Sequence, residues 1–249
     1  METGQEQLAA EARFEDAVEF SAASTAIPTP LEAATQSTED QPLVAGVDQS
    51  FLLDREPHRA LSAIVVMRGN DVVERVHAVT PLEIPYLPGL LAFREGGPIV
   101  EAMQRLECEP DLYLFDGSGR IHFRQAGIAT HMGVLFDVPA IGVAKSLLCG
   151  EPVGETSGLE TGETVAIQAG SGDRVNAPPE TTLGYAVQTK QYHSSSRYVN
   201  PVYVSPGHRI SAETAADLVL GLTAGYKLPE PIRLADGYAT EAKAEFGTE

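Results

Sequence analysis

Hydrophobic and polar positions between residues 43 and 80 follow a pattern typical of three consecutive β-strands. LVAGVDQSFLL (43–53) is an apolar segment of strand length that carries Asp48 near its middle. LSAIVVMRG (61–69) and DVVERVHAVT (71–80) are two further β-rich segments. They are joined at Gly69-Asn70, a dipeptide typical of tight hairpin turns. The pattern therefore predicts three strands, of which the last two form a hairpin.

The next segments predict helices and buried strands in alternation. PIVEAMQRLE (98–107) has the periodicity of a helix, with Pro98 in its first turn. LYLFD (112–116) and PAIGVAK (139–145) are short continuous apolar runs, as expected for strands buried on both faces. AGIATHMGVLF (126–136) lies between them and predicts a short helix. This strand–helix–strand unit should have a right-handed crossover.

The remainder of the chain predicts a β-rich insertion followed by one more strand and helix. TVAIQA (164–169) and TLGYAVQT (182–189) are candidate strands within a Gly- and Thr-rich stretch. NPVYVSPGHRIS (200–211) predicts a strand, a turn and a helix start, for which Ser211 is the natural N-cap. The segment after Pro229 is expected to lie on the surface.

Together these elements predict an α/β fold. Three antiparallel strands followed by parallel βαβ strands make one mixed sheet flanked by helices, the ribonuclease H-like layout, with a β-rich insertion. Residues 1–40 are rich in Ala, Glu, Ser and Thr and contain two helix-breaking prolines, Pro28 and Pro30. We expect them to form an acidic, partly ordered N-terminal arm without chemistry of its own. Residues 41–249 then form a single domain, in which Cys108 and Cys149 are expected to act as small buried hydrophobic residues.

Charge changes this picture, because the formal net charge is −18, with 35 acidic and 17 basic residues. Taken alone, this argues against nucleic acid as a partner, since phosphate binding normally depends on a basic face. Adaptation to high salt is the other interpretation, and the one we favour. At about 1 M salt the Debye length falls to about 3 Å, so that repulsion between surface charges is screened.

The cellular location follows from what the sequence lacks. No stretch approaches the roughly 18 apolar residues that a membrane span requires. The N-terminus has no basic start followed by an apolar run, which a secretory signal would show. We therefore expect a cytoplasmic protein without a membrane partner.

Three carboxylates occupy positions that suggest metal chemistry. Asp48 lies in mid-strand among apolar residues, so that it must either be exposed at a cleft or be neutralised by a cation. Asp116 ends an apolar run at the edge where open α/β sheets bind ligands. Glu95, in AFREGG, comes just before a predicted helix. A hard divalent cation such as Mg²⁺ or Mn²⁺ would relieve their repulsion. Because acidic residues are so frequent here, the pattern also allows three unrelated acids.

Five segments, in this order, resemble the endonuclease V family: GVDQS, PYLPGLLAFRE, PDLYLFDGSGRIHFRQAGIATHMG, PAIGVAKSLLCG and VYVSPGHRIS. The resemblance extends roughly from Leu43 to Ala224. It implies a ribonuclease H-like fold and a DNA repair endonuclease that recognises inosine, the product of adenine deamination. It also implies hydrolysis of the second phosphodiester bond 3′ to the lesion, Mg²⁺ as cofactor with Mn²⁺ as a substitute, and action as a monomer. Whether DNA or RNA is preferred stays open, because a 2′-hydroxyl contact depends on geometry.

At the matching positions, the resemblance implies that Asp48, Glu95 and Asp116 hold the metal. It assigns Tyr86 to a wedge whose ring replaces the stacking lost when the target base is flipped out. An ordinary buried tyrosine is the alternative. The residues that match the base pocket of the family are Gly89, Leu91, Gly119 and Ile128. Relatives commonly read DGHG where this chain has DGSG (116–119), and HPR where it has HFR (122–124), which affects the expected shape of that pocket.

Further catalytic positions that the resemblance implies are His122, Lys145 and His208. Lys145 ends a buried strand, where a cation needs an anion to meet, and a phosphate would supply one. A surface lysine at a strand end is the alternative. We expect Arg94 and Arg124 to contact phosphates. Two rival functions remain: another ribonuclease H-like nuclease that cuts hybrids or branched DNA, and a catalytically silent nucleic-acid-binding relative. The silent relative is favoured by the negative charge, although no metal acid is lost.

Overall fold

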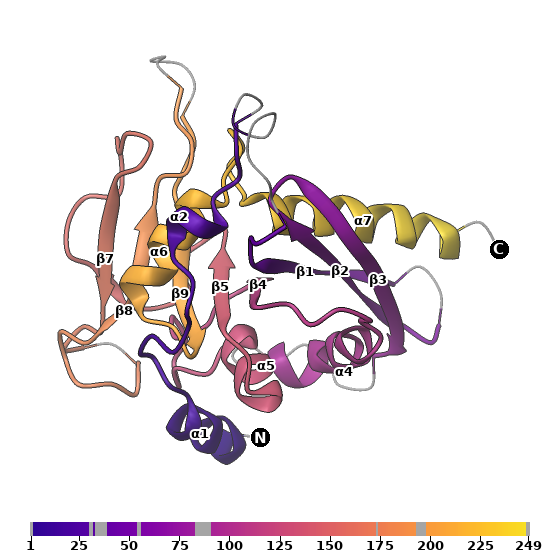
Figure 1. The fold of residues 1–249 in the computed structure, drawn as a ribbon. Helices are drawn as coiled ribbons and strands as arrows, with labels where there is room; N and C mark the ends of the chain where they lie inside the picture. The colour runs from indigo at the N-terminus through magenta and orange to yellow at the C-terminus, as the bar shows by residue number, and fades with distance from the viewer. Residues whose placement is uncertain are drawn as a thin grey trace.

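The computed structural model of the chain describes residues 2–29, 32, 39–53, 56–82, 91–172, 174–192 and 198–247. Within them, a mixed sheet of nine strands forms the centre of the fold, in the order β3-β2-β1-β4-β5-β9-β8-β7-β6 (Figure 1). The strands are β1 (Leu43–Leu52), β2 (Arg59–Arg68), β3 (Asp71–Pro81), β4 (Leu112–Asp116), β5 (Ala140–Ala144), β6 (Glu151–Pro152), β7 (Thr164–Gln168), β8 (Thr182–Val187) and β9 (Val202–His208).

The strand pairing confirms the predicted mixed sheet. β1, β2 and β3 are antiparallel neighbours, and β4 and β5 continue the sheet in parallel with β1. β9 runs antiparallel to β5, and the predicted β-rich insertion extends the same sheet through β8, β7 and β6. Gly69 has a φ of +57° in the turn between β2 and β3, as a tight hairpin turn requires.

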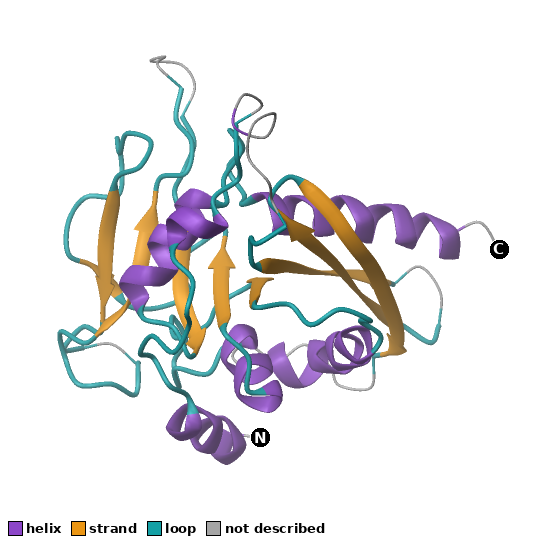
Figure 2. Cartoon of the chain, in the orientation of Figure 1, coloured by secondary structure: helices purple, strands orange, loops and turns teal. Residues whose placement is uncertain are grey.

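Helices cover both faces of this sheet (Figure 2). They are α1 (Glu2–Glu11), α2 (Ala22–Thr25), α4 (Leu91–Gln104), α5 (Ile128–Phe136), α6 (Ala212–Gly221) and α7 (Glu230–Gly247). The predicted N-cap of α6 is confirmed, since the Ser211 hydroxyl accepts a hydrogen bond from the backbone of Thr214. In the described part of the chain, no helix is long and apolar enough to cross a membrane.

The two faces of the central strands belong to two different cores. Val44, Leu114 and Val143 pack with residues of α6 and α7. Val47 and Phe115, which have the opposite parity along β1 and β4, pack with residues of α4 and α5. Side chains alternate along a strand, so that the parity of a residue decides which pair of helices it faces. This rule also places the candidate catalytic residues.

Two predictions about helices were wrong. Helix α4 begins at Leu91, so that Pro98 lies inside it and Glu95 belongs to the helix rather than preceding it. Proline removes only one helical N–H, and the buried Ile99 and Ala102 anchor the following turns in the core.

The two cysteines, both predicted to be buried, differ from each other. Cys149 is buried, whereas Cys108 is only partly buried.

The segment after Pro229 was predicted to lie on the surface, but it forms α7, which packs against β1 and β2. Its buried residues recur at helical spacing and are Ile232, Ala235, Ala239 and Ala242. Because alanine side chains are small, they give only a weak hydrophobic pattern in the sequence. The same small size allows the helix to pack closely against the sheet. A Cβ at Gly46 of β1 would lie 2.1 Å from the carbonyl carbon of Pro231, so that this contact requires glycine.

The N-terminal residues lie against the domain. Helix α1 packs near α5, and the backbone N–H of Arg13 donates to Nδ1 of His208 at 3.2 Å. The guanidinium of Arg120 lies 4.5 Å from the centre of the Phe14 ring. These contacts hold the arm along the edge of the sheet where β9 ends.

Candidate active site

Two predicted carboxylates meet where β4 ends beside the middle of β1. The parallel register sets Val47 opposite Phe115, so that Asp48 and Asp116 are next to each other on neighbouring strands. Both have the parity of the residues that face α6 and α7. Asp48 is only 7% exposed, so that its carboxyl is held out of water beside a second carboxyl.

Lys145 completes this arrangement. It follows the last residue of β5, and its Nζ donates to Oδ2 of Asp116 at 2.7 Å. Burial disfavours the charged ammonium, but the hydrogen bond and charge of Asp116, with the charges of Asp48 and Asp236, outweigh burial and raise the pKa of Lys145. The ammonium group of Lys145 therefore stays in its charged form beside the two carboxylates.

Burial, together with the charge and the hydrogen bond of Asp116, raises the pKa of Asp48 to about 7. A cation bound between the two carboxylates would relieve the repulsion that disfavours their charged forms. The donors are carboxylate oxygens, which suit Mg²⁺ or Mn²⁺, so that the pair fits such an ion. Among the described side chains, no group of three or more His, Cys, Asp or Glu residues is arranged around a metal position. The side chain of Glu95 lies outside the described residues.

Asp236 is a site residue that sequence reasoning missed. It lies on α7, where it is exposed, and its charge acts on both Asp48 and Lys145. The signal that could have found it is the spacing of Ile232, Ala235 and Ala239. That spacing predicts a helix whose buried face has Asp236 at its border.

His208 lies at the opposite end of the strands from Asp116 and Lys145. It pairs with Ala140 at the start of β5, whereas Lys145 follows the end of that strand. Its Nε2 is 3.0 Å from Oδ1 of Asp137, whose carboxylate also binds the guanidinium of Arg13. The structure therefore does not bring His208 to the carboxylates, and its visible role is to join the N-terminal arm to β9.

The loop that follows β4 contains three more of the predicted residues. A Cβ at Gly119 would lie 2.3 Å from the carbonyl oxygen of Pro206, so that this glycine is needed for packing against β9. His122 is buried, and its Nδ1 accepts a hydrogen bond from the backbone of Arg124 at 3.3 Å. The Arg124 guanidinium donates to Oε1 of Gln5 in α1 at 3.2 Å. These contacts attach the loop to β9 and to the N-terminal arm.

The predicted base pocket is described only in part. Ile128 begins α5 and is buried, and a Cβ at Gly117 would lie 2.6 Å from its Cγ2. Ile128 therefore lies beside the residue that follows Asp116, on the face of α4 and α5. Gly119, described above, packs against β9. Tyr86 and Gly89 lie wholly outside the described residues, and Leu91 and Arg94 do so in their side chains.

Comparison with known proteins adds to this geometry. The Endonuclease V family model matches residues 28–237. The chain belongs to the endonuclease V family. Curated endonuclease V relatives that are 51–56% identical come from halophilic archaea. The relative from Natronomonas pharaonis is 56% identical over 247 residues, which cover 99% of this chain and 92% of that protein.

Solved structures of endonuclease V share the fold. The enzyme from Streptomyces avermitilis is 30% identical, with a TM-score of 0.77 and coverage of 99% of this chain and 93% of that one. Endonuclease V of Ciona intestinalis is 27% identical, with a TM-score of 0.75 and coverage of 98% and 97%. It was solved in complex with a 24mer DNA containing an inosine followed by a ribo-adenosine. The predicted family and the mixed α/β fold are confirmed.

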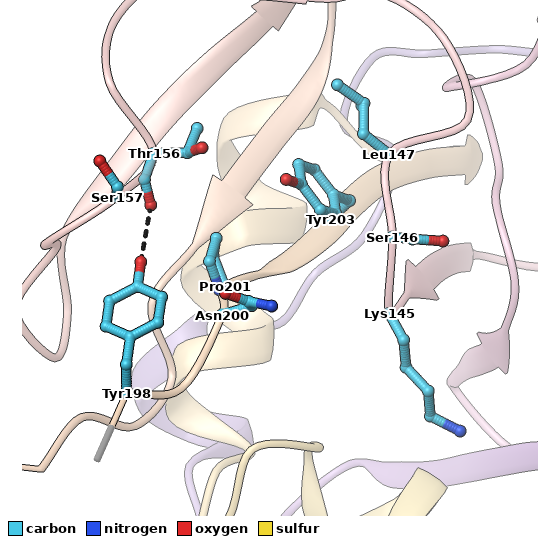
Figure 3. Close-up of a pocket in the computed structure, with 9 residues that line it drawn as sticks. All are labelled: Lys145, Ser146, Leu147, Thr156, Ser157, Tyr198, Asn200, Pro201 and Tyr203. Carbon is cyan, nitrogen blue, oxygen red and sulfur yellow. Dashed lines mark hydrogen bonds between the residues drawn. The ribbon is translucent and has the colours of Figure 1, made fainter. Parts of the chain in front are cut away.

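Beside Lys145, this endonuclease V has a pocket of about 290 Å³. Its lining residues are Lys145, Ser146, Leu147, Thr156, Ser157, Tyr198, Asn200, Pro201 and Tyr203 (Figure 3). The Tyr198 hydroxyl donates to the carbonyl oxygen of Thr156 at 3.1 Å. This volume is close to the lower end of ligand sites, roughly 300 Å³, and leaves room for part of a nucleotide next to Lys145.

High salt should stabilise this endonuclease V, because screening reduces the mutual repulsion of a chain with a net charge of −18. A gain of about 3 kcal/mol between dilute buffer and molar KCl would raise the Tm by roughly 6–12 °C for a chain of this size. Thermal unfolding followed by circular dichroism across KCl concentrations measures it, with sucrose as an uncharged control. A Tm that is already maximal in dilute buffer would contradict high-salt adaptation.

Proposed function

We propose that this protein repairs deaminated adenine in DNA by hydrolysing the second phosphodiester bond 3′ to inosine, in the cytoplasm and as a monomer. Mg²⁺ is the proposed cofactor, and Mn²⁺ can replace it. The observation that carries the proposal is the contact of Asp48, Asp116 and Lys145 at one strand edge. Family membership supports the nuclease activity, and the inosine-containing complex of the Ciona relative supports the choice of lesion.

The chain supplies the charges that this hydrolysis needs. Asp48 and Asp116 present oxygen ligands from neighbouring strands, and we assign Glu95 and Asp236 to the same ion. When bound, a divalent cation would polarise the scissile phosphate and lower the pKa of the attacking water. The ammonium of Lys145, 2.7 Å from Asp116, is positioned to offset the negative charge that grows on the phosphate in the transition state.

Lesion recognition is assigned to the face of α4 and α5. Tyr86 is the proposed wedge, and the proposed pocket for the flipped base consists of Gly89, Leu91, Gly119 and Ile128. Ile128 supports this assignment, because it packs beside Gly117, directly after the catalytic Asp116. The lesion pocket and the cleavage site are then separate parts of one groove, which explains cutting at a distance from the lesion. We assign Arg94 and Arg124 to the phosphates along this groove and keep His122 among the proposed catalytic residues.

A nicking assay with Mg²⁺ tests the proposal. Oligonucleotides that contain inosine should be cut at the second bond 3′ to it, leaving 3′-hydroxyl and 5′-phosphate ends, while matched adenosine oligonucleotides stay intact. In the Tyr86→Ala variant, the preference for inosine over adenosine substrates should fall roughly tenfold, because one stacking contact is removed. DNA and RNA versions of the same sequence establish which of the two nucleic acids is preferred.

Other outcomes of this assay would identify the rival functions. Equal cutting of undamaged, hybrid or branched substrates would show another ribonuclease H-like nuclease. Binding of inosine-containing strands without any metal-dependent nicking would show a catalytically silent relative. Either result would overturn the proposed activity, although not the family.

A further inference from the structure

Three of the four lysines in the chain gather at one edge of the sheet. Lys145 follows β5, Lys190 lies in the chain that leaves β8, and Lys227 lies between α6 and α7. These segments meet at the upper ends of the strands in Figure 1. The Thr189 hydroxyl donates to the carbonyl oxygen of Lys227 at 2.5 Å, which joins the second segment to the third. Lys243 is the remaining lysine and lies near the end of α7.

Two tyrosines complete what we call the lysine–tyrosine cluster, which consists of Lys190, Tyr192, Tyr226 and Lys227. The Lys190 ammonium lies 5.1 Å from the ring centre of Tyr192 and 5.6 Å from that of Tyr226. Tyr192 and Tyr226 are 38% and 52% exposed. The cluster therefore presents positive charge and aromatic surface to solvent in the same place.

The lysines of this cluster contact aromatic rings and backbone but, in the described part of the chain, no carboxylate. Among the described residues, neither Lys190 nor Lys227 forms an ion pair, although the chain has 35 acidic residues and 17 basic ones. Arg233 also contacts the Tyr226 ring, but it is paired with Glu230. Burial, and after it the nearby charge of Lys145, lowers the pKa of Lys227. Lysines gathered at one place in this way would be stabilised by a bound anion.

The position of the cluster relative to the carboxylates indicates which part of a substrate would reach it. Asp48, Asp116 and Lys145 point to the face of α6 and α7, and the cluster lies on that side. The proposed lesion pocket at Ile128 lies on the opposite face. A strand that runs from the lesion past the carboxylates therefore arrives at the cluster. Because the proposed cut is 3′ to the lesion, the nucleotides that arrive are those beyond the cut.

We propose that the lysine–tyrosine cluster binds the single-stranded flank on the 3′ side of the scissile bond, with its lysines on phosphates and its tyrosine rings on bases. The assignment of polarity rests on the proposed function. Exposed rings can stack only on bases that are not paired, so that the flank must be single-stranded there. Stacking also persists at salt concentrations that weaken phosphate contacts, which suits a protein adapted to high salt.

Equilibrium binding of fluorescent single-stranded DNA in EDTA, where cutting does not interfere, tests this proposal. One oligonucleotide has inosine near its 5′ end and a long 3′ flank, and its partner has the opposite arrangement. The full-length protein should bind the first more tightly. Tyr226→Ala should reduce this preference by about tenfold, since one stacked base is lost, whereas Tyr226→Phe should keep it. Lys190→Gln combined with Lys227→Gln should reduce it in dilute salt but not in molar KCl.

Lys243→Gln is the matched control and should leave the flank preference unchanged. A photoreactive base in the 3′ flank provides a second measurement without mutation, because it should crosslink to peptides containing Tyr192 or Tyr226. Equal binding of the two oligonucleotides, or crosslinks elsewhere, would overturn the proposal. A preference for the 5′ flank would overturn its polarity. Absence of nicking in the separate assay would instead overturn the proposed function, because these binding measurements do not depend on cutting.

Discussion

Replacing Asp116 by Asn is expected to reduce nicking of inosine-containing DNA by at least about a thousandfold while DNA binding is retained. Asp116 contributes one of the two adjoining carboxylates and is the hydrogen-bond partner of Lys145 at 2.7 Å. Its loss removes a proposed metal ligand and the hydrogen-bond partner of Lys145. A metal ion contributes several kcal/mol of transition-state stabilisation, and each 1.4 kcal/mol corresponds to about tenfold in rate. Single-turnover nicking rates with saturating Mg²⁺ measure the effect.

Binding by the Asp116→Asn variant is measured with the same inosine-containing oligonucleotides. Asp71→Asn is the control, because Asp71 is an exposed acid at the turn between β2 and β3. It removes the same charge away from the strand edge and should nick like the unmodified protein. Nicking by Asp116→Asn at the normal rate would rule out this carboxylate as a metal ligand, and loss of binding would indicate a general structural role.

Asp48→Asn is expected to stabilise the metal-free protein above neutral pH by about 2–4 kcal/mol. Burial and the neighbouring Asp116 raise the pKa of Asp48 from its ordinary value of 3.8 to about 7 in the folded protein. The folded state therefore keeps this proton to a higher pH than the unfolded chain does. The resulting contribution to stability is complete below about pH 4 and is lost as the pH rises through about 7. Asparagine never ionises, so the variant avoids this loss.

Urea unfolding in EDTA at pH 5 and pH 8 measures this prediction. The advantage of Asp48→Asn should be larger at pH 8, while Asp71→Asn should show no such pH dependence. Mg²⁺ should stabilise the unmodified protein by binding the folded state, more strongly above pH 7 than below it, and it should have little effect on Asp48→Asn. If Asp48→Asn is less stable than the unmodified protein at pH 8, the folded structure does not disfavour the charged form of the Asp48 carboxyl group.

Local patterns accounted for most of the elements. Continuous or alternating apolar runs identified β1 to β5, and Gly69-Asn70 identified the hairpin, because side-chain period and turn chemistry depend on neighbouring residues. The weak pattern of alanines concealed α7, and with it Asp236. Pro98 placed the start of α4 too late, because packing of the helix in the core outweighed the preference of proline for a first turn.

The sequence by itself determined the family, the mixed α/β layout and two acids, Asp48 within one buried strand and Asp116 at the end of another. Only the tertiary structure decided which residues share a site. The register of β5 and β9 separates His208 from Lys145, and the turn before α7 places Lys227 beside Lys190. Such proximity depends on pairing between segments far apart in the chain, and a local pattern of side chains contains no information about that distance.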